Sequence, residues 1–217
     1  MHYPIFSSIV NTIDTQLEKR GISAATFSTW ENSKINATGL ELEINLSKVS
    51  KYMKTLSINF DWDGFREHSL AKQLEGMESH PFLKIDKLNE SKITPTIDVE
   101  MSWLFDVNLC QPEHPDLSGN YRVEKASEWM DSVNRQVNQL LINDDIITRW
   151  HIEIEGDEQG RYLSAINLIS YFQYQLTSPQ SLNEVTHFVS RRLHDLLLKA
   201  NKVIFISDEI LAESVAA

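Results

Sequence analysis

The chain has 217 residues, 41% of them hydrophobic and 24% charged, and its formal net charge is −11 at pH 7. With only 7 glycines and 6 prolines, this composition is typical of a globular protein and argues against a disordered or linker-rich chain. No run of lysine and arginine is present to displace the counterions of a nucleic acid, so nucleic-acid binding is disfavoured. We expect one domain over residues 1–217, with a frayed tail from about residue 208.

Targeting and membrane segments are not expected either. Polar residues interrupt the apolar pattern of the first 20 positions, and no run of about 18 apolar residues occurs. Cys110 is the only cysteine, so the chain can form no internal disulfide, which fits a reducing compartment. We therefore expect a cytoplasmic protein without a membrane partner.

The first predicted element is a helix over residues 4–20. Ile5, Ile9, Ile13 and Leu17 recur every four positions, which places them on one helical face. Gly21 follows, where it can end the helix.

Strands are predicted next, because apolar and polar residues alternate with a period of two. The pattern is clearest over residues 40–46 and 56–62, which we expect to pair as antiparallel neighbours. A weaker strand precedes them at residues 25–30, and a long one follows over residues 94–108, with an apolar face that extends from Ile97 to Val107. The strands at residues 40–46, 56–62 and 94–108 each have one apolar and one polar face.

The second half of the chain predicts two helices and a hairpin. A helix is predicted over residues 122–142 by a buried apolar stripe of Val123, Ala126, Met130, Val133, Val137 and Leu140. A capping-box pattern at Ser181 and Glu184 opens another helix that extends to about Ala200. Between them, residues 150–155 and 161–175 are predicted to form a hairpin closed by the turn from Gly156 to Gly160. The run from Val203 to Ile206 predicts a short buried strand or a docked tail.

Together these elements predict an α+β fold. The economical arrangement is a single, mostly antiparallel sheet of about five to six strands, with three long helices packed on one face. The order of helix, strands, helix, hairpin and helix resembles that of type III secretion chaperones, which are also acidic. The resemblance lies in the order of elements, and a fold does not fix a function.

The excess negative charge is concentrated in the middle of the chain. Between Ile97 and Gly160 there are fourteen acidic and four basic residues, so this segment carries −10 of the net charge. If one sheet face is covered by helices, the polar strand positions converge on the other face. We therefore predict a partner- or cation-binding surface made of Asp98, Glu100, His151, Glu153 and Glu155. A solvated sheet face with no function is the alternative interpretation.

The function expected from these features is a non-enzymatic protein-binding or assembly module, similar to a chaperone, that uses the acidic sheet face to bind a basic protein. A homodimer is also compatible with the sequence. We assign no catalytic residue, no resident metal and no cofactor, because no nucleotide-binding or hydrolase motif occurs.

Two other functions are compatible with the sequence. One is a metal-assisted hydrolase that uses His151, Glu153 and Glu155 with Asp98 or Glu100. The other is a carrier of a small apolar ligand, with a pocket between sheet and helices lined by strand aromatics. Those aromatics are Trp103, Phe105, Trp150, Tyr162, Tyr171, Phe172 and Tyr174. Cys110 could act as a nucleophile with His114 or His151, but an inert buried thiol is the simpler interpretation.

Overall fold

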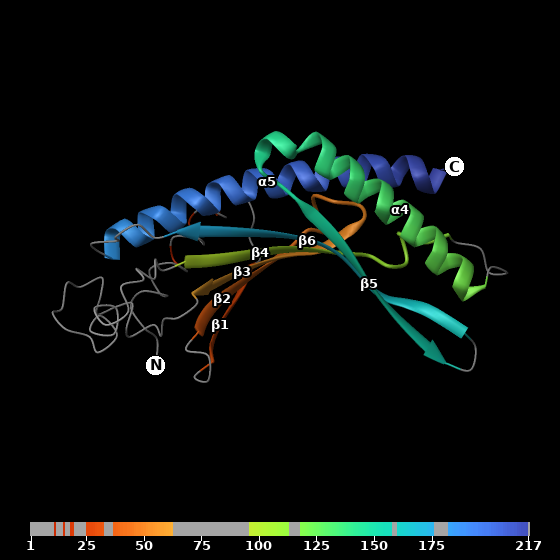
Figure 1. Ribbon diagram of the computed structural model, residues 1–217, viewed down its shortest axis with the longest axis horizontal. Helices are drawn as coiled ribbons and strands as arrows, with labels where there is room; N and C mark the ends of the chain where they lie inside the picture. The colour runs from red at the N-terminus through yellow and green to blue at the C-terminus, as the bar shows by residue number, and fades with distance from the viewer. Residues whose placement is uncertain are drawn as a thin grey trace, which may run out of the picture. The chain divides into compact units, whose positions relative to one another are not determined.

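The structure, a computed structural model, describes residues 25–32, 37–62, 96–112, 118–157, 160–175 and 182–216, together with residues 11, 15, 18 and 19. Within these ranges lie six strands, two long helices and one short 3₁₀ helix (Figure 1). In chain order they are β1 (Ala25–Asn32), β2 (Ala37–Asn45), β3 (Met53–Trp62), β4 (Thr96–Phe105), α4 (Gly119–Leu140), the 3₁₀ helix η1 (Ile142–Asp144), β5 (Thr148–Asp157), β6 (Gly160–Gln175) and α5 (Leu182–Ala216).

The strands form one sheet in the order β1-β2-β3-β4-β6-β5. The predicted antiparallel sheet with helices, an α+β fold, is confirmed, and β2 and β3 are neighbours as expected. The predicted hairpin is also confirmed, because β5 and β6 pair antiparallel from Thr148 opposite Ser170 to Asp157 opposite Gly160. The register shifts between Glu153 and Ile154, where β6 contains one more residue than β5.

The period of two seen in the sequence decides which strand residues are buried. On β2, Leu40, Leu42 and Ile44 are at most 1% exposed, whereas Glu41 and Glu43 are exposed. Strand β4 buries Val99, Met101, Trp103 and Phe105 in the same way. Full burial of such side chains stabilises the fold by about 2 kcal/mol each. Strand β4 ends at Phe105, so Val107, predicted to extend its apolar face, lies in the following turn instead.

The chain divides into two compact units. The first comprises Met1–Leu42, Asn59–Val99 and Phe172–Leu196, and the second comprises Glu43–Ile58, Glu100–Tyr171 and Leu197–Ala217. In the described part of the first unit, the Arg192 guanidinium lies 4.7 Å from the centre of the Tyr174 ring. The expectation of a single domain stays a prediction.

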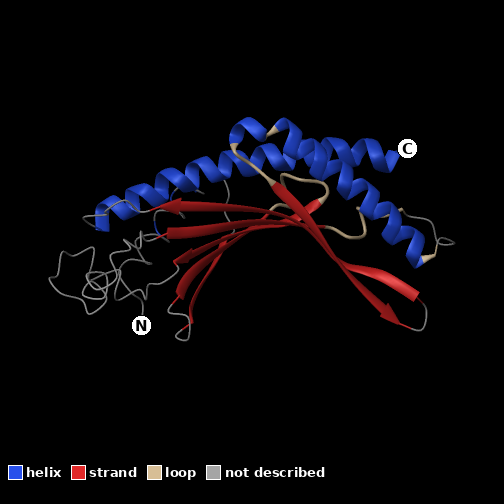
Figure 2. Cartoon of the chain, in the orientation of Figure 1, coloured by secondary structure: helices blue, strands red, loops and turns tan. Residues whose placement is uncertain are grey.

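In the second unit, the strands are covered on one side by α4 and by the part of α5 from Leu197 onward (Figures 1 and 2). Helix α4 packs on β5, and it buries Val123, Ala126, Met130, Val133 and Val137. These five residues follow the helical period and match the predicted stripe. Leu140, also predicted to be buried, is 60% exposed, and the next residue, Leu141, is buried instead.

The prediction of three long helices needs correction, because two are present in the described ranges. The helix expected over residues 4–20 falls mostly outside the described residues, although Asn11, Thr15 and Glu18 are helical. No helix in the described ranges is both long and apolar enough to cross a membrane.

The run from Val203 to Ile206 was predicted to be either a short strand or a docked tail. The strand alternative is wrong, as is the predicted end of the last helix near Ala200. Helix α5 continues through both to Ala216. Val203, Ser207 and Leu211 are each 0% exposed, and they continue the stripe of Leu196 at helical spacing, whereas Phe205 is 64% exposed. Burial of this stripe overrides the strand preference of the β-branched run.

Candidate functional site

The outward face of β5 and β6 in the second unit carries the side chains predicted for the site. Pairing with β6 sets Arg149 opposite Ile169, His151 opposite Asn167 and Glu153 opposite Ala165. Between them on β5, Trp150 and Ile152 pair with the buried residues Leu168 and Ile166. Because neighbouring strand residues point to opposite faces, the side chains of Arg149, His151 and Glu153 lie on the other side of the sheet. His151, Glu153 and Glu155 are all exposed.

Two tyrosines of β6 are joined to glutamates of the neighbouring strands. The Tyr162 hydroxyl donates to Glu155 Oε2 at 2.9 Å, and its side chain is 46% exposed. Tyr171, which is 64% exposed, hydrogen-bonds through its hydroxyl to Glu100. Each pair presents a carboxylate beside an exposed aromatic ring, and we refer to Glu100, Glu153, Glu155, His151, Tyr162 and Tyr171 together as the acidic face.

The pKa of Tyr171 is affected by the charged groups around its hydroxyl. The hydrogen bond to Glu100 is the main cause that raises the pKa of Tyr171, and partial burial and the Glu100 charge raise it further. Arg149 acts in the opposite direction and lowers the pKa of Tyr171, so a cation lies near this end of the acidic face.

The structure does not bring all five predicted residues together. Asp98 belongs to the first unit, where its Oδ1 accepts a hydrogen bond of 2.9 Å from Gln173 Nε2. In the second unit, β6 lies between Glu100 on β4 and His151 on β5. His151 faces Asn167, whereas Glu100 bonds Tyr171, four residues further along β6. At standard strand spacings, Glu100 and His151 are therefore on the order of 15 Å apart.

The separation of Glu100 from His151 is relevant to the alternative function, a metal-assisted hydrolase. His151 Nε2 lies 4.0 Å from Glu153 Oε1, and both side chains are about 60% exposed. Within the described residues, no three His, Cys, Asp or Glu side chains gather in a way that could hold a metal ion. The residues that a metal-assisted hydrolase would need are therefore spread along the acidic face.

The aromatic residues predicted to line an apolar pocket are also separated. Trp103 and Phe105 are at most 1% exposed and belong to the core, whereas Tyr162 and Tyr171 point outward on the acidic face. Tyr174 is partly buried in the first unit, and that burial is the main cause that raises its pKa.

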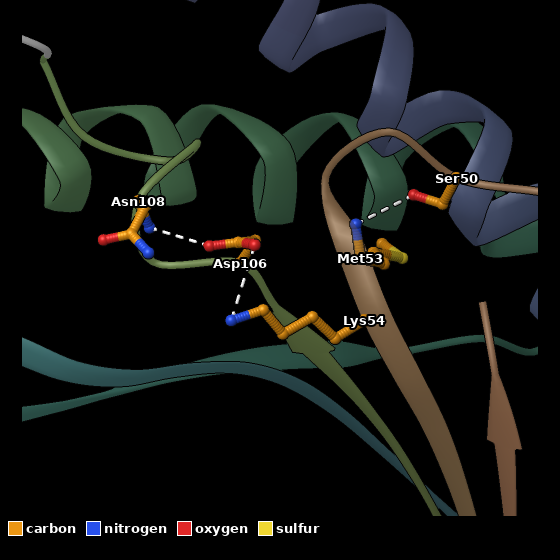
Figure 3. Close-up of polar contacts among 5 residues, drawn as sticks. All are labelled: Ser50, Met53, Lys54, Asp106 and Asn108. Carbon is orange, nitrogen blue, oxygen red and sulfur yellow. Dashed lines mark hydrogen bonds and ion pairs between the residues drawn. The ribbon is translucent and has the colours of Figure 1, made fainter. Parts of the chain in front are cut away.

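A separate network of polar contacts in the second unit fixes two turns. Asp208 of α5 accepts hydrogen bonds from the Ser50 hydroxyl at 2.7 Å and from the backbone N–H of Lys51 at 2.9 Å. Ser50 Oγ in turn accepts from the backbone N–H of Met53 at 2.9 Å (Figure 3). The turn between β2 and β3 is thereby tied to α5.

The turn after β4 is held in a similar way. Asp106 forms an ion pair with Lys54 at 3.4 Å, and its other carboxylate oxygen accepts from the backbone N–H of Asn108 at 3.0 Å (Figure 3). The Asp106 backbone N–H donates to the Tyr52 carbonyl at 2.8 Å, so the two turns are bonded to each other.

Cys110 lies inside this region. It is 0% exposed, and burial raises the pKa of its thiol from 9.0 to about 12, with the charges of Asp106 and Asp208 adding to the effect. A nucleophilic role needs an accessible thiolate, so the buried thiol agrees with the inert interpretation. His114, one of its predicted base partners, lies outside the described residues.

We expect the native Cys110 thiol to be unreactive. A pKa near 12 makes the thiolate at pH 8 about a thousandfold rarer than for an ordinary thiol. Ellman's reagent at pH 8 should therefore modify the native protein at least about a hundredfold more slowly than the guanidine-unfolded protein. The neutral thiol stabilises the fold below about pH 9, and this contribution is lost as the pH rises toward 12. Equal rates in the two states would contradict this assignment.

Sequence reasoning missed Asp208 and Ser50, since Asp208 falls in the segment predicted to be a frayed tail. One signal was present: Asp208 immediately follows Ser207, which continues the apolar stripe of α5 at helical spacing. That period would have predicted a helix at this position, but its contact with a turn 158 residues earlier could not be read from the sequence.

Comparison with known proteins adds no assignment. No protein-family model, no curated protein and no solved structure matches the chain.

Proposed function

We propose that this protein is a non-enzymatic binding module that docks a basic segment of another protein on the acidic face. The observation that carries the proposal is the pair of exposed tyrosine–glutamate contacts, Tyr162 with Glu155 and Tyr171 with Glu100. Of the described elements of the second unit, both helices lie on the other side of the strands (Figure 2).

The chemistry of these pairs suits lysine and arginine. A carboxylate attracts the cation, and an adjacent aromatic ring interacts favourably with its charge. Tyrosine is also among the residues that contribute most to protein interfaces. The two tyrosines are nine positions apart on β6, which corresponds to roughly 30 Å, long enough for an extended segment to contact both.

A pull-down with matched charge variants tests the proposal. The face variant carries Glu100→Gln, Glu153→Gln and Glu155→Gln. The control variant carries Glu124→Gln, Glu209→Gln and Glu213→Gln, which changes the net charge equally at exposed positions of the two helices. Tagged wild-type and control proteins should retain the same basic proteins from a lysate of the source cells at low salt, and the face variant should lose them.

A defined probe gives a second measurement. A fluorescent peptide of alternating lysine and arginine should bind wild type and control alike, and the face variant should bind at least tenfold more weakly, with all affinities falling as salt rises. Equal binding by the face and control variants in both experiments would show that only net charge matters and would refute the proposal.

A further inference from the structure

A pocket of about 740 Å³ opens in the second unit, and none of the residues of the acidic face lines it. Its walls are the turn between β2 and β3, the loop after β4, the first half of α4 and the end of α5. The volume falls within the range of roughly 300–1,000 Å³ that is usual for small-molecule sites.

The charged side chains that line the pocket are cationic. Lys51 and Lys125 line it, and no carboxylate is among its lining residues in the described part of the chain. Lys125 also pairs with Glu128 at 2.5 Å on α4, and that glutamate side chain is 62% exposed. In a chain with a formal net charge of −11, the charged side chains that line this pocket among the described residues, Lys51 and Lys125, are both cationic.

Aromatic surface accompanies both lysines. Lys51 Nζ lies 4.9 Å from the centre of the Tyr52 ring, and Lys125 Nζ lies 5.9 Å from that of Tyr121. Tyr121, Lys125 and Trp129 follow one another at intervals of four residues, so α4 presents them as one stripe to the pocket. The pocket therefore combines cations with flat apolar walls.

Hydrogen bonds within the protein fix two of the walls, the turn between β2 and β3 and the loop after β4. The Asp208 carboxylate accepts a hydrogen bond from the backbone N–H of Lys51, and Ser50 Oγ accepts from the backbone N–H groups of Tyr52 and Met53. The Tyr52 carbonyl accepts from the backbone N–H of Asp106. Figure 3 shows the two turns that these contacts hold. A preformed site avoids the entropy of ordering its walls on binding.

We propose that this pocket binds a small organic anion with an aromatic body. The anionic group is held by Lys51 and Lys125, and the aromatic body packs against Tyr121 and Trp129. An uncharged molecule of the same shape lacks the ionic contribution and binds more weakly.

Titration calorimetry with 1-naphthoate tests this inference, with 1-naphthalenemethanol as the uncharged analogue. Wild-type protein should bind one naphthoate per chain, at least tenfold more tightly than the alcohol. The variant Lys51→Met with Lys125→Met should lose at least tenfold in affinity for naphthoate while its affinity for the alcohol changes little. Lys48→Met is the matched control, because Lys48 is exposed on the same turn and does not line the pocket.

The comparison of naphthoate with the alcohol on wild-type protein does not depend on any variant. Equal affinity for the two compounds, or no saturable binding up to 1 mM, would overturn the inference. Naphthoate binding that is unaffected by the lysine pair would also overturn it, because the anion would then be bound elsewhere.

Discussion

Replacing Asn138 by alanine is expected to lower the free energy of unfolding by about 2–4 kcal/mol. The Asn138 side-chain amide forms two hydrogen bonds with the backbone of Thr148 at the start of β5. Its Oδ1 accepts from the Thr148 N–H at 2.6 Å, and its Nδ2 donates to the Thr148 carbonyl at 3.0 Å. Thr148 is only 1% exposed, so water cannot replace the lost partners without opening the packing of α4 on β5. Each buried group left unpaired costs about 1–3 kcal/mol.

Urea unfolding followed by circular dichroism measures this effect. Asn143→Ala in η1 is the control, because that side chain is exposed and its loss should change stability by less than about 0.5 kcal/mol. Asn138→Asp keeps the acceptor for the Thr148 N–H but puts an oxygen where the carbonyl needs a donor, so it should also destabilise the fold. A loss with Asn138→Ala as small as that of the control would show that the amide does not hold β5.

Alanine at Gly119 is expected to destabilise the protein by about 1–3 kcal/mol, as overpacking does in a well-packed region. Gly119 is the first residue of α4, and a Cβ at this position would clash with the carbonyl oxygen of Arg161. That atom belongs to the backbone of β6, so the clash can be relieved only by moving the helix end or the strand. In a helix, alanine is otherwise preferred over glycine by up to about 1 kcal/mol, so propensity alone predicts the opposite sign.

Gly156→Ala is the matched control for this substitution. A Cβ at Gly156 would meet its nearest atom, the Gly160 carbonyl oxygen, at 3.8 Å, which is an ordinary contact. Thermal and urea unfolding of the two variants should therefore differ, with only Gly119→Ala less stable by more than about 1 kcal/mol. If Gly119→Ala is as stable as wild type, the close approach of α4 to β6 is wrong.

The sheet could be predicted in outline because its signal is local. Burial at every second residue of β2 and β4 follows from the pleat, which places Leu40, Leu42 and Ile44 on one side whatever the neighbouring strand. The hairpin of β5 and β6 could also be predicted from the sequence, because its turn is short and its two strands are consecutive in the chain. The end of α5 was not predicted, because Val203 to Ile206 favours a strand locally and only the burial of a helical stripe decides otherwise.

The candidate sites depended more heavily on the tertiary structure. Alternation placed His151, Glu153 and Glu155 on one face, and the register of β5 with β6 agrees. The alternation could not show that Glu100 pairs with Tyr171, because that contact depends on β6 lying beside β4 in the sheet. Nor could it show the pocket, whose two lysines are 74 positions apart in the chain.

By itself, then, the sequence determined the α+β class, the faces of the strands, the concentration of negative charge and a helix predicted over residues 122–142, which the structure places at Gly119–Leu140. Each follows from the spacing of residue types along a short stretch, which covalent geometry converts directly into a face or a period. Only the tertiary structure decided that Asp208 holds the turn at Ser50, that Gly119 meets the backbone of Arg161 and that Lys51 and Lys125 line one pocket. These contacts join residues far apart in the chain, and their geometry is fixed by how helices and strands pack rather than by any local preference.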